Sequence, residues 1–195
     1  SLYLEDLIEQ GLEQMKEHPA IAKITIDEYK KKVLEDTLYG SLKFYDLHFA
    51  THTDYTFSWD SVLNTKGNSA PYLQNAYARI DSIFFKMYGV EKPNRPILDI
   101  DMILAKNKHM DNNPDVEQIA KLMLNAQIAN EITDHIEAND SQFLTNAVTE
   151  LSKQFHYFYE MVNVSNLEGV VQYFALDVIE YVAKTIKRMA NILGI

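Results

Sequence analysis

Asp46, His48 and His52 are the residues whose types and spacing come closest to a metal site. Two histidines four residues apart present both imidazoles on one face of a helix, where they can share an ion. However, the threonines beside them favour extended backbone, and no further ligand is evident. We therefore predict solvated or hydrogen-bonded side chains here and no metal site.

A second group with chemical capacity lies between Tyr72 and Arg79. Steps of three and four residues place Tyr72, Asn75 and Arg79 on one face of a helix and apolar side chains on another, so the first face can stay in water. An unpaired base can stack on a tyrosine ring, for about 1–3 kcal/mol, and an arginine can pair with a phosphate. The structural alternative is that the same side chains only complete the surface of a helical bundle.

Lys184, Lys187 and Arg188 form a basic group near the end of the sequence. Such cations can contact RNA phosphates, but they also interact favourably with the dipole at a helix C-terminus, and the sequence leaves both interpretations open. The formal net charge of −10 makes the overall field of the protein repulsive to nucleic acid. Any RNA contact must therefore come from a local basic face or from stacking side chains.

The composition is that of a globular protein of one ordinary domain. Of the 195 residues, 47% are hydrophobic and 24% are charged, which excludes wholesale disorder. The absence of cysteine excludes disulfides and thiolate metal sites and favours a reducing compartment, so we expect a cytoplasmic location. No run approaches the roughly 18 apolar residues that a spanning helix needs, and we expect no membrane association.

Helical periodicity dominates the sequence and predicts an all-α helical bundle. The predicted helices begin near Leu4, Thr25, Pro71, Pro114, Asp140 and Asn166. Thr25 is predicted to open a capping box, and Asp140 and Asn166 are predicted to act as N-caps. The helical period breaks over 49–68, which predicts a connector, and the Gly, Pro and Asn residues of 89–113 predict a long loop.

The helix that follows Asp140 has a predicted buried stripe of aromatic and aliphatic side chains. Its members are Phe143, Leu144, Ala147, Leu151, Phe155 and Phe158. The aromatic run from 155 to 159 is therefore interpreted as core, although Tyr157 or Tyr159 can point outward from the same helix.

The segment from Phe57 to Arg79 carries a specific motif. It contains Phe57-Ser-Trp-Asp and, after a short interval, Gly67-Asn-Ser-Ala-Pro-Tyr-Leu-Gln-Asn-Ala-Tyr-Ala-Arg. This resembles the arginyl-tRNA synthetase block of Phe-x-Trp-Asp followed by Gly-Asn-Thr/Ser-Ala-Pro-Tyr-Leu-Gln-Tyr-Ala-Tyr/His-Ala-Arg. Chance matches at so many fixed positions are far rarer than matches to a short phosphate-loop pattern.

The resemblance covers essentially the whole sequence. Tyr39-Gly-Ser-Leu-Lys-Phe-Tyr-Asp-Leu is similar to an upstream segment of the family, and Ile192-Leu-Gly-Ile is similar to its ending. The adenylation motifs of these enzymes, His-x-Gly-His and a Lys-Met-Ser-Lys-like loop, do not occur. We therefore expect the C-terminal piece of a longer enzyme, inactive by itself; the alternative is a catalytically empty paralogue that serves as a protein- or RNA-interaction module.

The resemblance implies an anticodon-binding bundle of the class I synthetase type at 49–195, preceded at 1–48 by a helical connection to an absent catalytic domain. It implies the anticodon stem-loop of arginine tRNA as the partner of a monomeric chain. ATP and magnesium are implied for the parent enzyme, and no cofactor for this part of it. The tRNA-binding candidates are Tyr72, Gln74, Asn75, Arg79, Lys184, Lys187 and Arg188.

Three positions depart from the family pattern. Asn75 replaces the usual second tyrosine, which removes a stacking ring but keeps hydrogen-bonding capacity. Ala175 and Met189 stand where the last helix usually has an arginine and a glycine, so these two family roles are not transferred. We expect Trp59 to pack inside the bundle and Asp60 to cap the short helix after it.

Overall fold

A computed structural model of the chain describes residues 4–16, 27–49, 54–89, 113–135 and 141–195. These ranges contain helices and connecting turns and no strand. The elements are α1 (Leu4–Lys16), α3 (Asp27–Leu47), α4 (Trp59–Val62), α5 (Ala70–Tyr88), α7 (Pro114–His135), α8 (Ser141–Met161), the short 3-10 helix η2 (Val164–Asn166) and α9 (Gly169–Leu193).

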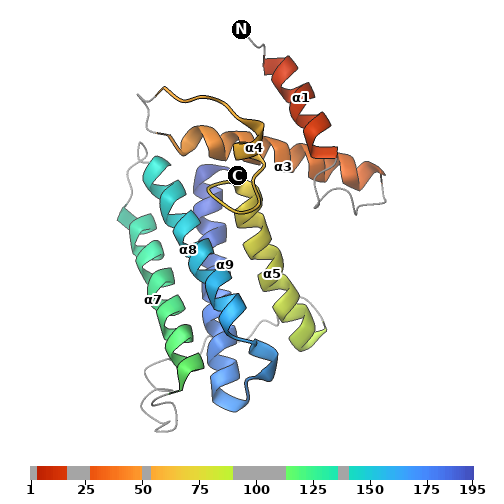
Figure 1. Cartoon of the computed structure of the whole chain (residues 1–195). Coiled ribbons are helices and arrows are strands. Elements are labelled where there is room, and N and C mark those ends of the chain that lie inside the picture. The colour runs from red at the N-terminus through yellow and green to blue at the C-terminus, as the bar shows by residue number, and fades with distance from the viewer. Residues whose placement is uncertain (1–3, 17–26, 50–53, 90–112, 136–140) are drawn as a thin grey trace.

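Four long helices, α5, α7, α8 and α9, pack along one another as the main bundle (Figure 1). Their largest buried side chains are aromatic, with Phe84, Phe155, Phe158 and Phe174 inaccessible to solvent. Apolar residues recur at helical spacing on these elements, so each helix turns one stripe toward a shared core. The predicted all-α bundle is confirmed.

A smaller core lies where α1, α3 and α4 meet. Met15 of α1 is buried with Leu34 and Leu38 of α3, and Trp59 of α4 packs against them. Farther along α3, Phe44 is buried in the main bundle, so this one helix joins the two cores. Figure 1 shows α3 crossing one end of the bundle with α1 beyond it. The prediction for Trp59 is thus wrong in detail, because its ring packs on the α1–α3 pair.

Local signals fix both ends of α5, the helix that carries most of the RNA-binding candidates. The Ser69 hydroxyl accepts a hydrogen bond from the Tyr72 backbone N–H at 3.3 Å, and Pro71 lies in the first turn, where a missing N–H costs nothing. Gly89 ends the helix in the left-handed conformation, with φ of 70°. The predicted helix is confirmed with its predicted ends.

Three smaller predictions are wrong. Asn166 lies inside the 3-10 helix, and α9 begins after Glu168, which makes no side-chain cap. Asp60 lies in the first turn of α4 and does not cap it; Ser58 is at that position, also without a side-chain bond. Phe143 is 57% exposed in the first turn of α8, so it does not belong to the buried stripe of that helix.

Two expected helix starts, at Thr25 and Asp140, and most of the expected 89–113 loop lie outside the described residues. Within the described parts of the chain, no helix is long and apolar enough to cross a lipid bilayer.

Candidate RNA-binding site

The face of α5 that carries Tyr72 and Arg79 meets α8 at His156 and Tyr159. The Tyr72 ring lies 4.6 Å from the ring of His156, measured between centroids. Arg79 Nη1 lies 3.1 Å from His156 Nδ1, and its guanidinium carbon lies 4.9 Å from the centre of the Tyr159 ring. Because Tyr72 and Arg79 are seven residues apart, or about two helical turns, both reach the same stretch of α8.

The protonation state of His156 follows from its partners. A guanidinium only donates hydrogen bonds, so Nδ1 must accept, and the proton resides on Nε2, which faces the Tyr72 carbonyl at 3.5 Å. The imidazole is buried, at 8% exposure. Burial, and secondarily the charge of Arg79, hold the pKa of His156 below its usual value. The ring is therefore neutral at physiological pH.

The remaining side chains of this face keep contact with solvent. Tyr72, Asn75 and Arg79 are each partly exposed, and Tyr159 is 40% exposed. Partial burial is the main cause that raises the pKa of the Tyr72 phenol, and Arg79 opposes it. Tyr72 thus stays protonated and able to donate. We name this group, Tyr72, Asn75, Arg79, His156 and Tyr159, the α5–α8 face.

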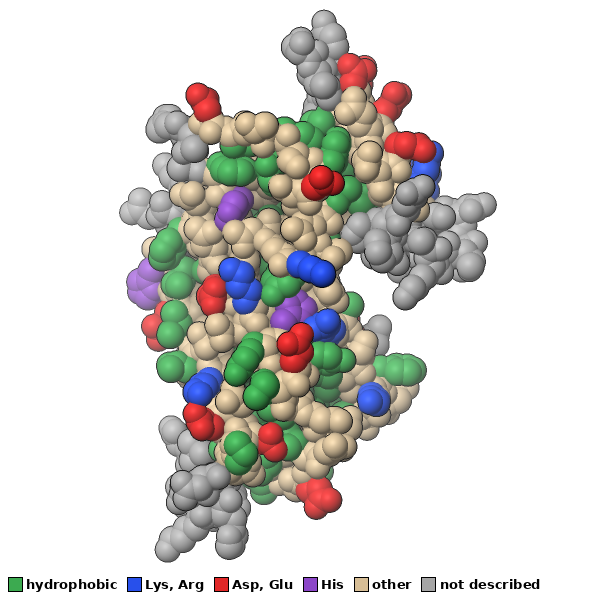
Figure 2. Space-filling model, viewed as in Figure 1, with side chains coloured by type: hydrophobic (Ala, Val, Ile, Leu, Met, Phe, Trp, Pro, Cys, Tyr) green, Lys and Arg blue, Asp and Glu red, His purple; other side chains and the backbone are tan. Residues whose placement is uncertain are grey.

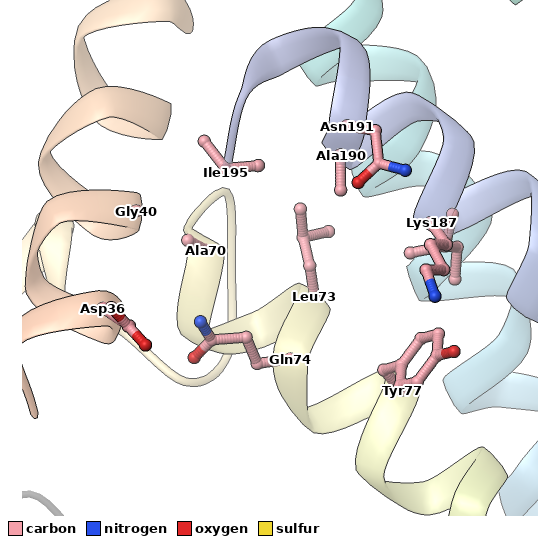
Figure 3. Close-up of a pocket in the computed structure, with 11 residues that line it drawn as sticks. Asp36, Gly40, Ala70, Leu73, Gln74, Tyr77, Lys187, Ala190, Asn191 and Ile195 are labelled. Atoms are coloured by element: carbon pink, nitrogen blue, oxygen red, sulfur yellow. The ribbon is translucent and has the colours of Figure 1, made fainter. Parts of the chain in front are cut away.

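Gln74 and Lys187 lie elsewhere, on a cavity of about 310 Å³ between α3, α5 and α9. In Figure 3, Gln74 lies near Asp36 on one side of this cavity and Tyr77 lies near Lys187 on the other. The wall between them is largely apolar and includes the C-terminal residue Ile195. The predicted candidates on α5 therefore point in two directions: Tyr72 and Arg79 contact α8, with Asn75 between them at helical spacing, and Gln74 lines the cavity.

The three predicted basic residues of α9 have different surroundings. Lys184 pairs with Glu180 at 2.8 Å. Arg188 bonds Asp134 at 2.5 Å and Asn130 at 2.8 Å, both on α7. Lys187 makes no ion pair with the described residues and faces the cavity. No basic residue lies in the last turn of α9, so attraction to the helix end explains these cations poorly.

Opposite charges are mixed over the surface that includes α5 and α8. Figure 2 shows basic side chains in the middle of this view, with acidic ones among them, and a gathering of acidic side chains at the α1 end. The exposed acidic residues of α1 are Glu5, Asp6, Glu9 and Glu13. The net negative charge is therefore unevenly distributed, as a local RNA contact requires.

The residues with metal-like spacing have other partners. Asp46 accepts a hydrogen bond from the Tyr55 hydroxyl at 2.6 Å, which is the main cause that raises the pKa of Tyr55 to about 12. His48 Nε2 lies 3.2 Å from the side-chain amide of Asn68. His52 lies outside the described residues. Among those described, no three acidic or histidine side chains come together as metal ligands.

His156 is the site residue that sequence reasoning missed. The outward orientation of Tyr159, which its place in the helix allows, is confirmed. His156, by contrast, follows a buried phenylalanine in a run interpreted as core. The signal that could have found it is its spacing of three residues from Tyr159, which places both on one side of α8.

Comparison with known proteins agrees with the sequence resemblance. The DALR anticodon binding domain family matches residues 73–195. An arginine--tRNA ligase of Actinobacillus succinogenes is 33% identical in an alignment of 195 positions that covers 98% of this chain and 31% of that protein. One of Haemophilus ducreyi is 30% identical over 194 residues, covering 98% of this chain and 32% of that protein. The chain thus spans about a third of the length of these relatives.

Two solved structures share the fold. The arginyl-tRNA synthetase of Thermus thermophilus superposes with a TM-score of 0.73 at 15% identity, covering 100% of this chain and 32% of that one. That of Plasmodium falciparum gives a TM-score of 0.67 at 22% identity, covering 100% and 33%. The resemblance inferred from the Phe57–Arg79 motif is confirmed.

Proposed function

Because this chain belongs to the DALR anticodon binding domain family, we propose that it binds the anticodon stem-loop of an arginine tRNA. The chain would hold the tRNA while another part of a longer arginine--tRNA ligase attaches arginine to it. ATP and magnesium would be used by that other part, since neither adenylation motif occurs in this sequence. We propose that this longer enzyme is cytoplasmic and monomeric.

The observation that carries the proposal is the chemistry of the α5–α8 face. Arg79 has no carboxylate within ion-pair distance among the described residues, so its charge is available to a phosphate. The partly exposed Tyr72 ring contacts His156, and the exposed Tyr159 ring lies against Arg79. An unpaired nucleotide offers a flat base and an anionic phosphate, and this combination of rings and a cation suits both.

Asn75 gives this face a polar group where the resembled family motif has a tyrosine. Its amide can donate to and accept from a base edge, whereas it cannot supply a stacking surface. We therefore propose that base stacking falls mainly on Tyr72, with hydrogen bonding from Asn75.

A fluorescence anisotropy titration tests the proposal. The 195-residue chain is titrated against a labelled anticodon stem-loop of arginine tRNA and against a hairpin of equal length with a scrambled loop, each at two salt concentrations. We expect tighter binding to the cognate loop. Tyr72→Ala should lower the affinity for this loop by about five- to 100-fold, which corresponds to the free energy of one base stack.

Tyr39→Ala is the matched control, since Tyr39 is an exposed tyrosine on α3, away from the α5–α8 face. It should leave affinity unchanged. Equal affinity for both hairpins, with no effect of Tyr72→Ala, would contradict anticodon recognition and favour a general interaction module.

A further inference from the structure

One side chain, His156, links both RNA-binding candidates of the α5–α8 face. Its ring contacts the Tyr72 ring and carbonyl, and its Nδ1 accepts from Arg79. We infer that His156 is a positioning residue: its neutral imidazole holds the Arg79 guanidinium in the orientation that meets the RNA. This inference rests on the proposed function. It adds that His156 sets the orientation in which Arg79 contacts the RNA.

The first argument concerns what else could orient Arg79. A long side chain samples many rotamers, so a guanidinium that binds one phosphate or base must be held by its neighbours. Among the described residues, Arg79 has two such neighbours, His156 Nδ1 at 3.1 Å and the Tyr159 ring at 4.9 Å. The ring fixes the plane of the guanidinium only loosely, whereas the directional hydrogen bond fixes its rotation.

The second argument concerns charge. A carboxylate in the place of His156 would orient Arg79 equally well, but it would also neutralise the cation. A neutral acceptor orients the guanidinium and leaves its full positive charge for an anionic partner. Glu160, the next acidic residue along α8, influences the proton affinity of His156 without forming an ion pair with Arg79. A neutral imidazole as the partner of Arg79 therefore suits an RNA contact better than a carboxylate would.

The third argument concerns the register of the two helices. His156 Nε2 points to the Tyr72 carbonyl at 3.5 Å, while Nδ1 points to Arg79 about two turns away on α5. The same imidazole also packs against the Tyr72 ring, with 4.6 Å between centroids, so it contacts both the ring proposed to stack on a base and the cation proposed to meet a phosphate.

The test is a double-mutant cycle in RNA affinity. His156→Phe keeps a ring of similar size but removes the acceptor, and His156→Asn keeps an acceptor near the position of Nδ1. Each change is made in the wild type and in Arg79→Ala, and affinity for the labelled arginine tRNA stem-loop is measured. Thermal unfolding of every variant is recorded in parallel.

We expect His156→Phe to weaken binding by about five- to 20-fold in the wild type and by less than about twofold in Arg79→Ala. His156→Asn should recover most of the affinity. Equal losses in both backgrounds, or a His156→Asn variant as weak as His156→Phe, would overturn the inference, because a purely structural role does not depend on Arg79.

A second measurement covers the case in which His156→Phe does not fold. Nitrogen-15 NMR of the His156 ring in the wild type must show an unprotonated Nδ1 whose signal shifts in Arg79→Ala and on RNA addition. A protonated Nδ1, or a signal that RNA does not move, would overturn the inference. If the wild type binds no RNA at all, the proposed function itself fails, whereas a binding wild type with an indifferent His156 refutes only the positioning role.

Discussion

The guanidinium of Arg79 on α5 lies over the ring of Tyr159 on α8, with 4.9 Å between the guanidinium carbon and the ring centre. The contact joins two helices that are far apart in the sequence, and it keeps the cation partly exposed without a carboxylate partner among the described residues. A cation held against a ring retains its charge, which is what an RNA-binding surface needs in a chain of net charge −10.

Replacing Tyr159 by leucine should weaken RNA binding modestly. The variant removes the ring beneath Arg79, a contact worth about 0.5–1 kcal/mol at an exposed site, so we expect a loss of affinity of about two- to fivefold. Tyr157→Leu is the control, because Tyr157 is 53% exposed on another side of the same helix. The measurement is stem-loop anisotropy, and equal effects of the two substitutions would argue against the Arg79 contact.

Ser69→Ala should destabilise the chain through the start of α5. The Ser69 hydroxyl accepts from the Tyr72 N–H and donates to the Asn64 carbonyl, and the loss of such an N-cap costs about 0.5–2 kcal/mol. The free energy of unfolding, measured in urea, should fall by that amount. Ser82→Ala is the control on the same helix, since its exposed hydroxyl only bonds the Ala78 carbonyl behind it. Similar losses from both variants would show that capping is unimportant here.

Gly11→Ala should separate α1 from α3. A methyl group at Gly11 would overlap the ring of Trp59 and the side chain of Leu38, so the helices must move apart. Trp59 is the single tryptophan of the sequence, and its emission should shift to longer wavelength as water reaches the ring. Gly40→Ala on α3, whose methyl group would meet no described atom within 4 Å, should leave the emission unchanged. An unshifted spectrum in Gly11→Ala would contradict this packing.

Alanine substitutions of Lys187 and Arg188 should affect RNA binding differently, although the two residues are neighbours in the sequence. Lys187 has no ion-pair partner among the described residues, so Lys187→Ala should weaken RNA binding and reduce the salt slope of log affinity by about 0.7 if it meets one phosphate. Arg188 already binds Asp134 and Asn130, so Arg188→Ala should cost up to about 1 kcal/mol of stability and affect RNA less. The opposite ranking of salt slopes would place the RNA contact on the α7 side of α9.

Acid should destabilise the chain through the buried His156 and the partly buried His48. Burial is the main cause that lowers the pKa of both His156 and His48, aided by Arg79 and Lys153 respectively, so unfolding lets each imidazole take up a proton. The associated stability is complete above the unfolded pKa near 6.5 and is lost as the pH falls below it. Glu160, whose charge acts on His156, opposes this effect.

The measurement is the free energy of unfolding between about pH 7.5 and pH 5, the range that spans the unfolded pKa of histidine. It should fall with decreasing pH in the wild type and fall less steeply in His156→Asn, which has no proton to gain there. Parallel curves for the two proteins would mean that His156 is not the titrating group.

Much of the fold follows from local sequence patterns. Apolar steps of three and four residues mark the helices, and Ser69, Pro71 and Gly89 mark the ends of α5, because caps and glycine act on the backbone within a few residues. The Phe57–Arg79 motif is enough by itself to identify the family. Predictions failed where a local rule had to decide exposure or packing partner, as at Phe143 and Trp59, and where it had to choose the N-cap, as at Asn166 and Asp60.

The sequence by itself therefore determined the helices, the family and the face of α5 that holds Tyr72, Asn75 and Arg79. Only the tertiary structure decided that Arg79 meets His156 and Tyr159, that Gln74 lines the cavity with Lys187, and that Arg188 is tied to α7. The physical reason is the sequence separation of the residues that make each contact. A helix forms from contacts within four residues, but the partner of an outward side chain depends on how two helices dock, which no single segment encodes.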